Sequence, residues 1–177
     1  MTPLFKRAVV ATIKHEGGFN DIKHDRGGAT NWGVSLRFLR SINLDLDGDG
    51  DVDFIDVKNM TKQQAEEIYF DNFWKPLYDR LPDLVAFKVF DVSVNAGSSR
   101  AHILLQRALN KIGANLKTDG LIGPVTLGVI SKYTPQAIVN AYCVAQQEFY
   151  DGIIKRDPTQ AKFSAGWKNR AKYLFKL

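Results

Sequence analysis

Apolar residues recur at helical spacing through most of the chain. The first run follows Thr2-Pro3, a helix cap with proline at the first helical position. The residues that share its inward face are Leu4, Phe5, Ala8, Val9, Thr12 and Ile13. This spacing predicts an amphipathic helix that ends at the glycine pair Gly17-Gly18.

Similar runs follow, each bounded by a cap or by a helix breaker. Thr61 and Gln64 form a capping-box pattern, and Asp157-Pro158 breaks the longest run. We expect helices at 35–42, from Thr61 to near Pro76, from Pro82 to Asn95, from Ser99 to Gly113, after Pro124, from Thr134 to about Arg156, and towards Leu177. The pattern contains no clean repeat and no flexible linker, so it predicts a mainly α protein.

The stretch HEGGFNDIKHDRGGATNWG, residues 15–33, departs from this pattern. Its glycine pairs predict a small β-hairpin. Glu16 falls on or beside the apolar face of the first helix, at the helix C-terminus. Partial burial and the negative end of the helix dipole both raise a carboxyl pKa, which suits a general acid. Taken alone, Glu16 also fits a solvated residue in the last helical turn.

The residues after Glu16 make the pattern more specific. Eight residues separate Glu16 from Asp25 and four separate Asp25 from Thr30. The arrangement resembles the catalytic residues of phage-type lysozymes, which usually have one more residue between the aspartate and the threonine. The strings EGGF and DRGGATNWG look like glycoside hydrolase family 108, the endolysin-type N-acetylmuramidases. This resemblance implies a lysozyme-like α+β fold with Glu16, Asp25 and Thr30 as catalytic residues.

Residues 45–56, DLDGDGDVDFID, place aspartates at loop positions 1, 3, 5, 7, 9 and 12 and glycine at position 6. This pattern resembles the calcium loop of an EF-hand or dockerin, in which Ca²⁺ takes six to eight oxygen ligands. The expected metal ligands are Asp45, Asp47, Asp49, Asp51, Asp53 and Asp56. Asp51 would use its backbone carbonyl and Asp53 a water. Asp56 replaces the usual glutamate and is one methylene shorter.

A solvated acidic loop without metal is the alternative interpretation of residues 45–56. Six aspartates within twelve residues repel one another without a cation, which favours the calcium site. A lone loop indicates a structural Ca²⁺, and we expect no cofactor for catalysis.

The composition fits one domain of ordinary size, or a domain with a small appended lobe, because 45% of the 177 residues are hydrophobic. A single cysteine, Cys143, excludes an internal disulfide. The N-terminal segment resembles neither a signal peptide nor a transmembrane helix. We therefore expect a monomer that stays in the host bacterial cytoplasm until release and then reaches the periplasm and cell wall.

The charge is unevenly distributed. The net charge is +5, but six of the 19 acidic residues lie within 45–56, so the rest of the chain carries +11. A basic body attracts anionic polymers. The chain contains no nucleic-acid-binding motif, so the acidic cell envelope is the expected partner and nucleic acid is not.

The second half of the chain carries its own resemblance. The strings AFKVFDVSVNAGSSRAHILLQRAL and DGLIGPVT are similar to the predicted peptidoglycan-binding segment that accompanies family 108 catalytic regions. We expect a catalytic region at 1–83, with the acidic loop inside it, and a helical peptidoglycan-binding region at 84–177 packed on it. A short turn-plus-helix motif also serves folding alone.

Aromatic and amide side chains are candidates for sugar contacts. Trp32 lies beside Thr30, and Asn95 precedes a helix-ending glycine, so both are predicted to bind substrate. Trp32, Trp74 and Trp167 are each also explained by core packing. The three histidines are too scattered for a zinc site.

These observations predict a peptidoglycan hydrolase that cleaves the bond between N-acetylmuramic acid and N-acetylglucosamine. By resemblance Glu16 protonates the leaving oxygen, and Asp25 and Thr30 position the attacking water, with inversion of configuration. Two alternatives are a lytic transglycosylase that forms 1,6-anhydro products and a non-catalytic, calcium-dependent envelope-binding protein.

Overall fold

The computed structural model describes residues 1–16, 18–20 and 28–172, and only the backbone of residues 14–16. Within these ranges the chain is mainly helical with one two-stranded sheet. Apart from its first two residues, it divides into two compact units, Pro3–Asn72 and Phe73–Leu177. No helix among the described residues is both long and apolar enough to cross a bilayer.

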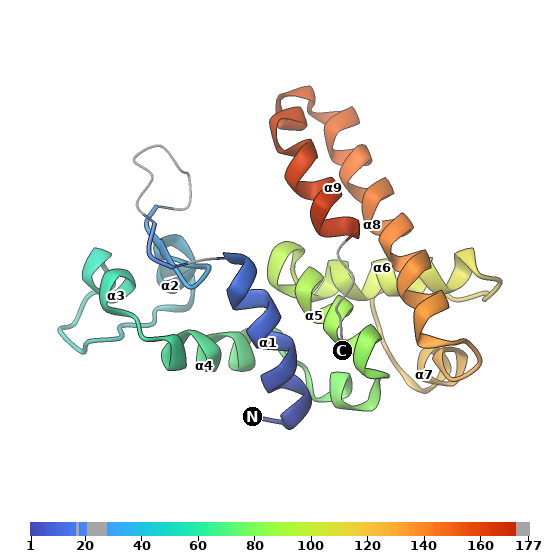
Figure 1. Cartoon of the computed structure of the whole chain (residues 1–177), viewed down its shortest axis with the longest axis horizontal. Coiled ribbons are helices and arrows are strands. Elements are labelled where there is room, and N and C mark those ends of the chain that lie inside the picture. The colour runs from blue at the N-terminus through green and yellow to red at the C-terminus, as the bar shows by residue number, and fades with distance from the viewer. Residues whose placement is uncertain (17, 21–27, 173–177) are drawn as a thin grey trace. The chain divides into compact units, whose positions relative to one another are not determined.

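The first unit contains α1, a small sheet and three further helices (Figure 1). Its elements are α1 (Pro3–Glu16), β1 (Thr30–Asn31), β2 (Val34–Ser35), α2 (Leu36–Ile42), α3 (Phe54–Asn59) and α4 (Lys62–Phe73). The predicted inward face of α1 is confirmed, because Phe5, Ala8 and Ile13 are buried. Phe5 packs edge-on against Phe70 of α4, with the ring centroids 5.0 Å apart.

The sheet is a tight hairpin with a two-residue turn. Thr30 pairs with Ser35 and Asn31 with Val34 in antiparallel register. The turn residues Trp32 and Gly33 both have positive φ, 51° and 80°. Positive φ at both positions is the requirement of the turns that match strand twist in two-residue hairpins. The prediction of a small β-hairpin is confirmed, and among the described residues its strand pair begins at Thr30.

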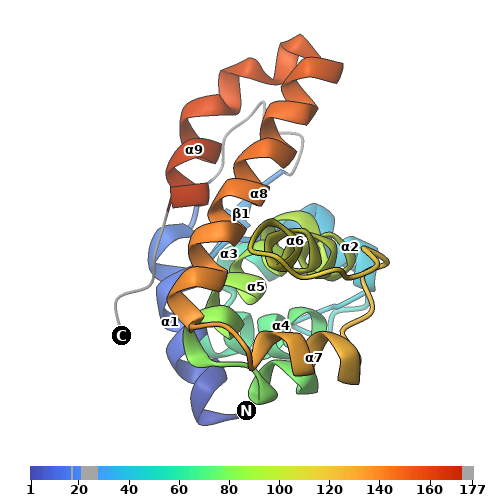
Figure 2. The same ribbon diagram turned by 90° about the vertical axis from the view of Figure 1, so that its right-hand side faces the viewer.

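The second unit is built around α5 (Asp83–Ala96), α6 (Ser98–Lys111) and α8 (Pro135–Arg156). These three helices pack on one another, and α9 (Ser164–Lys172) lies along the second half of α8 (Figures 1 and 2). The connecting elements are η1 (Pro76–Arg80), α7 (Pro124–Ile130) and η2 (Pro158–Phe163). The core contains the fully buried Phe90, Leu104 and Leu105.

The caps that the sequence predicts are present. Thr61 N–H donates to Gln64 Oε1 at 2.9 Å, and Gln64 N–H donates to Thr61 Oγ1 at 3.2 Å. Thr134 Oγ1 accepts from Ala137 N–H before the long helix α8. Local side-chain acceptors satisfy the first N–H groups of a helix, so these boundaries follow from local sequence.

A fully buried lysine lies in α5. Lys88 Nζ donates to the carbonyls of Arg170 and Ala171, both at 3.1 Å, and burial lowers the pKa of Lys88. These carbonyls lie in the last turn of α9, where a helix has unsatisfied acceptors. Lys88 therefore joins α9 to the core of the second unit.

A buried histidine connects three parts of the second unit. His102 Nδ1 lies 3.0 Å from Gly120 O, and His102 Nε2 lies 2.9 Å from the hydroxyl of Tyr78. A carbonyl only accepts, so Nδ1 carries the proton, and Nε2 of the neutral ring accepts from Tyr78. Tyr78 also bonds Ser93 at 2.8 Å. Burial lowers the pKa of His102, with a smaller opposing effect from the bond to Gly120.

As the pH is lowered below about 6.5, the ordinary histidine pKa, we expect the free energy of unfolding to decrease. The unfolded chain binds a proton there that folded His102 does not, so His102 stabilises the fold fully above that pH. The loss is at most about 1.4 kcal/mol per pH unit, down to the lowered pKa of the folded state. Melting temperatures from pH 7.5 to pH 5 measure it. His102→Gln should flatten the dependence of melting temperature on pH, and the control His15→Gln/His24→Gln should keep it. A flattened dependence in the control would contradict the assignment of this effect to His102.

Candidate active site and acidic loop

The predicted general acid lies at the end of the first helix. Glu16 is the last residue of α1, as the glycine pair after it predicted. The side chain of Glu16 and the whole of Asp25 lie outside the described residues. Their catalytic roles therefore stay predictions.

Thr30 lies in the middle of a small backbone network. Its N–H and carbonyl exchange two hydrogen bonds of 2.8 Å with Asn20, and it pairs with Ser35 on its other side. The Thr30 hydroxyl faces the carbonyl of Asn20 at 3.5 Å. Asn20 precedes and Thr30 follows the segment that contains Asp25, so this bridge brings the residues that flank the segment together.

Two side chains of the hairpin bind the backbone after the acidic loop. The buried amide of Asn31 donates from Nδ2 to Val57 O at 2.9 Å and to Met60 O at 3.3 Å. Trp32 Nε1 donates to Met60 O at 3.1 Å, and the Trp32 carbonyl accepts from Tyr69 Oη at 3.0 Å. The orphan carbonyls at the end of α3 are thus satisfied from the hairpin. The role of Asn31 was not predicted from the sequence, where its only signal is an amide beside a turn.

The acidic loop joins α2 to α3 and turns at two glycines with positive φ, Gly48 and Gly50. Asp45 holds the turn, because Oδ1 accepts from Gly48 N–H at 2.6 Å and Oδ2 accepts from Gly50 N–H at 2.9 Å. These bonds lower the pKa of Asp45, that from Gly50 most. The loop is therefore wrapped around its first carboxylate in the way the spacing predicts.

Asp56 closes the loop from inside the protein. It is 2% exposed, and its carboxylate accepts from Leu46 N–H at 2.7 Å and from Asp53 N–H at 2.8 Å. Asp53 in turn accepts from Ile55 N–H at the start of α3, which completes a capping box. Helix α3 was not predicted from the sequence, although the D-x-x-D spacing of Asp53 and Asp56 is a capping signal.

The loop gathers its carboxylates in two groups, Asp45, Asp47 and Asp49, and Asp51, Asp53 and Asp56, each with ligand atoms within 4.8 Å of one another. Desolvation, and then repulsion from neighbouring carboxylates, raises the pKa of Asp47 and of Asp51. A hard cation would relieve that repulsion, and carboxylate oxygens are the ligands that such cations prefer. The donor set therefore fits a metal ion.

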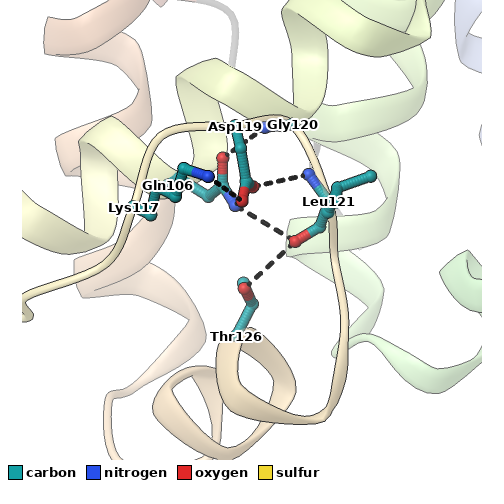
Figure 3. Close-up of polar contacts among 6 residues, drawn as sticks. All are labelled: Gln106, Lys117, Asp119, Gly120, Leu121 and Thr126. Atoms are coloured by element: carbon teal, nitrogen blue, oxygen red, sulfur yellow. Dashed lines mark hydrogen bonds and ion pairs between the residues drawn. The ribbon is translucent and has the colours of Figure 1, made fainter.

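The DGLIGPVT motif, residues 119–126, forms the end of the loop between α6 and α7 and the first turn of α7 (Figure 3). Gln106, buried in α6, donates to Asp119 Oδ1 at 2.9 Å and accepts from Gly120 N–H at 2.8 Å. The bond from Gln106, and then that from Leu121 N–H, lowers the pKa of Asp119. A Cβ at Gly120 would lie 3.4 Å from the backbone carbonyl of Ser99.

The polar groups of this motif therefore build the loop itself. Its apolar side chains point outward, since Leu121 is 74% and Val125 is 73% exposed. They border a hollow of about 300 Å³ that Lys117 and Thr126 also line. The motif was recognised from the sequence, but Gln106, the residue of α6 that hydrogen-bonds this loop, was not.

Asn95 lies near the end of α5 with its side chain exposed. Its Oδ1 accepts from the Tyr150 hydroxyl at 2.7 Å, and Gln146 Nε2 donates to that hydroxyl at 3.0 Å. Among the described residues, Asn95 Nδ2 makes no hydrogen bond, so its two N–H donors are oriented and available. Tyr150 and Gln146 are both buried in α8 and fix this orientation.

The other two tryptophans pack within the second unit. Trp74 is buried against Phe90, with the ring centroids 5.4 Å apart. Trp167 stacks on Tyr150, with the rings 5.0 Å apart and 15° from parallel. Core packing therefore accounts for Trp74, whereas Trp167 is partly exposed.

Comparison with known proteins gives two adjoining family matches. Residues 9–97 match the family described as glycosyl hydrolase 108, and residues 100–172 match one described as predicted peptidoglycan domain. A solved structure titled "Structure of Brucella abortus SagA" is similar at 31% identity and a TM-score of 0.75. The match covers 94% of this chain and 88% of that one. No curated protein of similar sequence was found.

Proposed function

The chain belongs to the glycosyl hydrolase 108 family, and from this premise we propose that it cleaves the glycan strands of peptidoglycan between N-acetylmuramic acid and N-acetylglucosamine. The observation that carries the proposal is the pair of matches along one chain, a glycosyl hydrolase at 9–97 and a peptidoglycan domain at 100–172. A glycoside hydrolase that acts on peptidoglycan accounts for both. The basic body of the chain, with +11 outside the acidic loop, favours an anionic envelope.

In the proposed reaction Glu16 protonates the leaving glycosidic oxygen. Asp25 stays ionised, stabilises the oxocarbenium-like transition state and, with Thr30, positions a water on the opposite face of the sugar. The end of α1 at Glu16 and the Asn20–Thr30 bridge support this assignment, because both bound the segment that carries Asp25. We propose inversion, which requires carboxyl groups about 6.5–9.5 Å apart, against about 5–5.5 Å for retention.

Trp32 and Asn95 are the proposed substrate-binding residues. The indole N–H of Trp32 already donates to Met60 O, so the face of the ring remains for stacking on a sugar. Asn95 offers two oriented N–H donors, which suit the carbonyl of an N-acetyl group. Both residues lie within the glycosyl hydrolase match.

We also propose that the acidic loop binds one structural Ca²⁺ through Asp45, Asp47, Asp49, Asp51, Asp53 and Asp56. Bound calcium would neutralise the repulsion between neighbouring carboxylates, which adds to the larger effect of desolvation in raising the pKa of Asp47 and Asp51. The loop leads directly into α3, whose last carbonyls bind Asn31 of the hairpin. Calcium would therefore stabilise the part of the unit that carries Thr30, without entering the reaction.

Digestion of purified sacculi with mass analysis of the soluble products tests the proposed reaction. Hydrolysis leaves a reducing N-acetylmuramic acid end, whereas a lytic transglycosylase leaves a 1,6-anhydro end that is lighter by one water. A non-catalytic envelope-binding protein would sediment with sacculi and release nothing. Either of these two results would overturn the hydrolase.

Hydrolysis of peptidoglycan is the reaction by which an endolysin acts. We propose that a bacteriophage, or a prophage in a bacterial genome, uses the protein to lyse the cell wall of its host. The enzyme would then be made in the host cytoplasm and act as a monomer once it reaches the periplasm and the wall.

A further inference from the structure

The α8–α9 hairpin carries a cluster of positive charge that extends from the end of α8 through η2 and back along α9. Residues 152–172, the basic tip, contain six basic residues and one acidic residue. They comprise the end of α8, η2 and α9, which pack on one another (Figures 1 and 2). The basic tip alone thus has a net charge of +5, equal to that of the whole chain.

Most of these basic side chains have no acidic partner in the part of the chain that the structure describes. Five exposed side chains of the basic tip form no ion pair among the described residues: Lys155, Arg156, Lys162, Lys168 and Lys172. Arg170 is the exception, with Nε 3.4 Å from Asp91 Oδ1. The single acid, Asp157, accepts from Thr159 N–H at 3.1 Å and from Gln160 Nε2 at 3.0 Å. Its carboxylate therefore caps η2.

An aromatic row supports the basic tip from inside. Tyr150 is buried, Trp167 stacks on it, and Phe163 lies 5.8 Å from Trp167 between ring centroids. Phe163 ends the row and is 46% exposed. Lys162 Nζ lies 5.1 Å from the centroid of the Phe163 ring. The row therefore ends in an exposed aromatic ring beside Lys162.

We propose that the basic tip docks on the surface of an anionic phospholipid bilayer. Clustered lysine and arginine attract anionic headgroups, and aromatic rings prefer the boundary between headgroups and acyl chains. Lysine stems can also lie along apolar surface while their ammonium groups stay in water. The basic tip provides both features on one projecting hairpin (Figure 1).

The shape of the basic tip favours a membrane over a glycan strand. Sites for sugars and small ligands are concave and lined by convergent polar groups. The basic tip is instead the end of a helical hairpin, where α8 turns through η2 into α9 (Figures 1 and 2). A helical hairpin that presents an exposed aromatic ring together with exposed basic side chains suits a planar anionic partner. The docking is independent of the glycosidase reaction, and it would hold the enzyme near the membrane that bounds its substrate layer.

Co-sedimentation of the full chain with vesicles tests the proposal. Vesicles of phosphatidylcholine alone are compared with vesicles that also contain phosphatidylglycerol, at low and high NaCl. We expect binding only to the anionic vesicles and a decrease with salt. The charge reversal Lys162→Glu/Lys168→Glu should lower the partition coefficient at least about tenfold, and Phe163→Ser about fivefold.

The matched control is Lys58→Glu/Lys132→Glu, which makes the same charge change at exposed lysines outside the basic tip. All variants should keep the wild-type melting temperature. Equal binding to neutral and anionic vesicles, no binding to either, or an equal loss in the control would overturn the proposal. Loss of binding to sacculi in the tip variants, without vesicle binding by the wild type, would reassign the basic tip to the cell wall.

Discussion

Glu16→Gln should abolish the release of soluble fragments from sacculi, with a loss of at least about a thousandfold in turnover. A general acid contributes about 10² to 10⁴ in rate, and the amide has no proton to give to the leaving oxygen. Turbidity of a sacculus suspension and the yield of soluble fragments measure the loss. The variant should fold normally, because the substitution changes neither the size of the side chain nor its place at the end of α1.

The control for this loss is Glu67→Gln, the same change at an exposed glutamate of α4. We expect it to keep full activity. Both variants should melt at the wild-type temperature. Substantial turnover by folded Glu16→Gln would rule out Glu16 as the acid, whatever the reaction.

Removal of calcium should lower the melting temperature by about 5–10 °C. A ligand present at one hundred times its dissociation constant stabilises the native state by about 2.7 kcal/mol. For a chain of this length each kcal/mol corresponds to about 2–4 °C. Thermal unfolding in excess calcium and in EGTA measures the shift, and elemental analysis gives the calcium content of the purified protein.

Asp47→Asn/Asp49→Asn separates calcium binding from any other effect of EGTA. This variant should melt at one temperature with and without calcium, and in EGTA it should be at least as stable as the wild type, because two repelling charges are gone. Asp71→Asn/Asp151→Asn, the same change at exposed positions, should keep the calcium dependence. If EGTA does not change the melting curve and the purified protein contains no calcium, the acidic loop does not bind a structural Ca²⁺.

The helices could be predicted from sequence because their boundaries are local. Pro135 after Thr134 begins α8, and Gly97, with φ of 84°, ends α5. These residues act through their own dihedral angles and side-chain acceptors, so no distant partner is needed. Helix α3 was missed because its apolar positions are few and it begins within the metal-loop pattern.

Long-range polar contacts could not be predicted in this way. Lys88 falls in an apolar helix, and its partners are carbonyls 82 and 83 residues later in the chain. Asn31 binds carbonyls 26 to 29 residues away, and Gln106 holds a loop on the far side of a turn. Such a residue is recognised only when the partner backbone is placed, since one amide or ammonium in a sequence has many possible acceptors.

In the candidate site, too, the local features could be predicted from the sequence and the long-range contacts could not. The spacing of the six aspartates predicted a loop that wraps, and the bonds of Asp45 to Gly48 and Gly50 agree with it. The catalytic assignments of Glu16 and Asp25 rest on resemblance and stay predictions; the family match at 9–97 covers both residues. A role for Asn95 in substrate binding was predicted from its place before a helix-ending glycine. The contact with the buried Tyr150, which orients the Asn95 amide, could not be predicted from the sequence.

The most direct test of the account is digestion of purified peptidoglycan by the wild-type enzyme, followed by mass analysis of the products with and without calcium. A muramidase should release disaccharide-peptides that end in reducing N-acetylmuramic acid, in either condition below the melting temperature of the calcium-free protein. Products that end in 1,6-anhydro-N-acetylmuramic acid, or intact glycan strands after prolonged incubation, would contradict it.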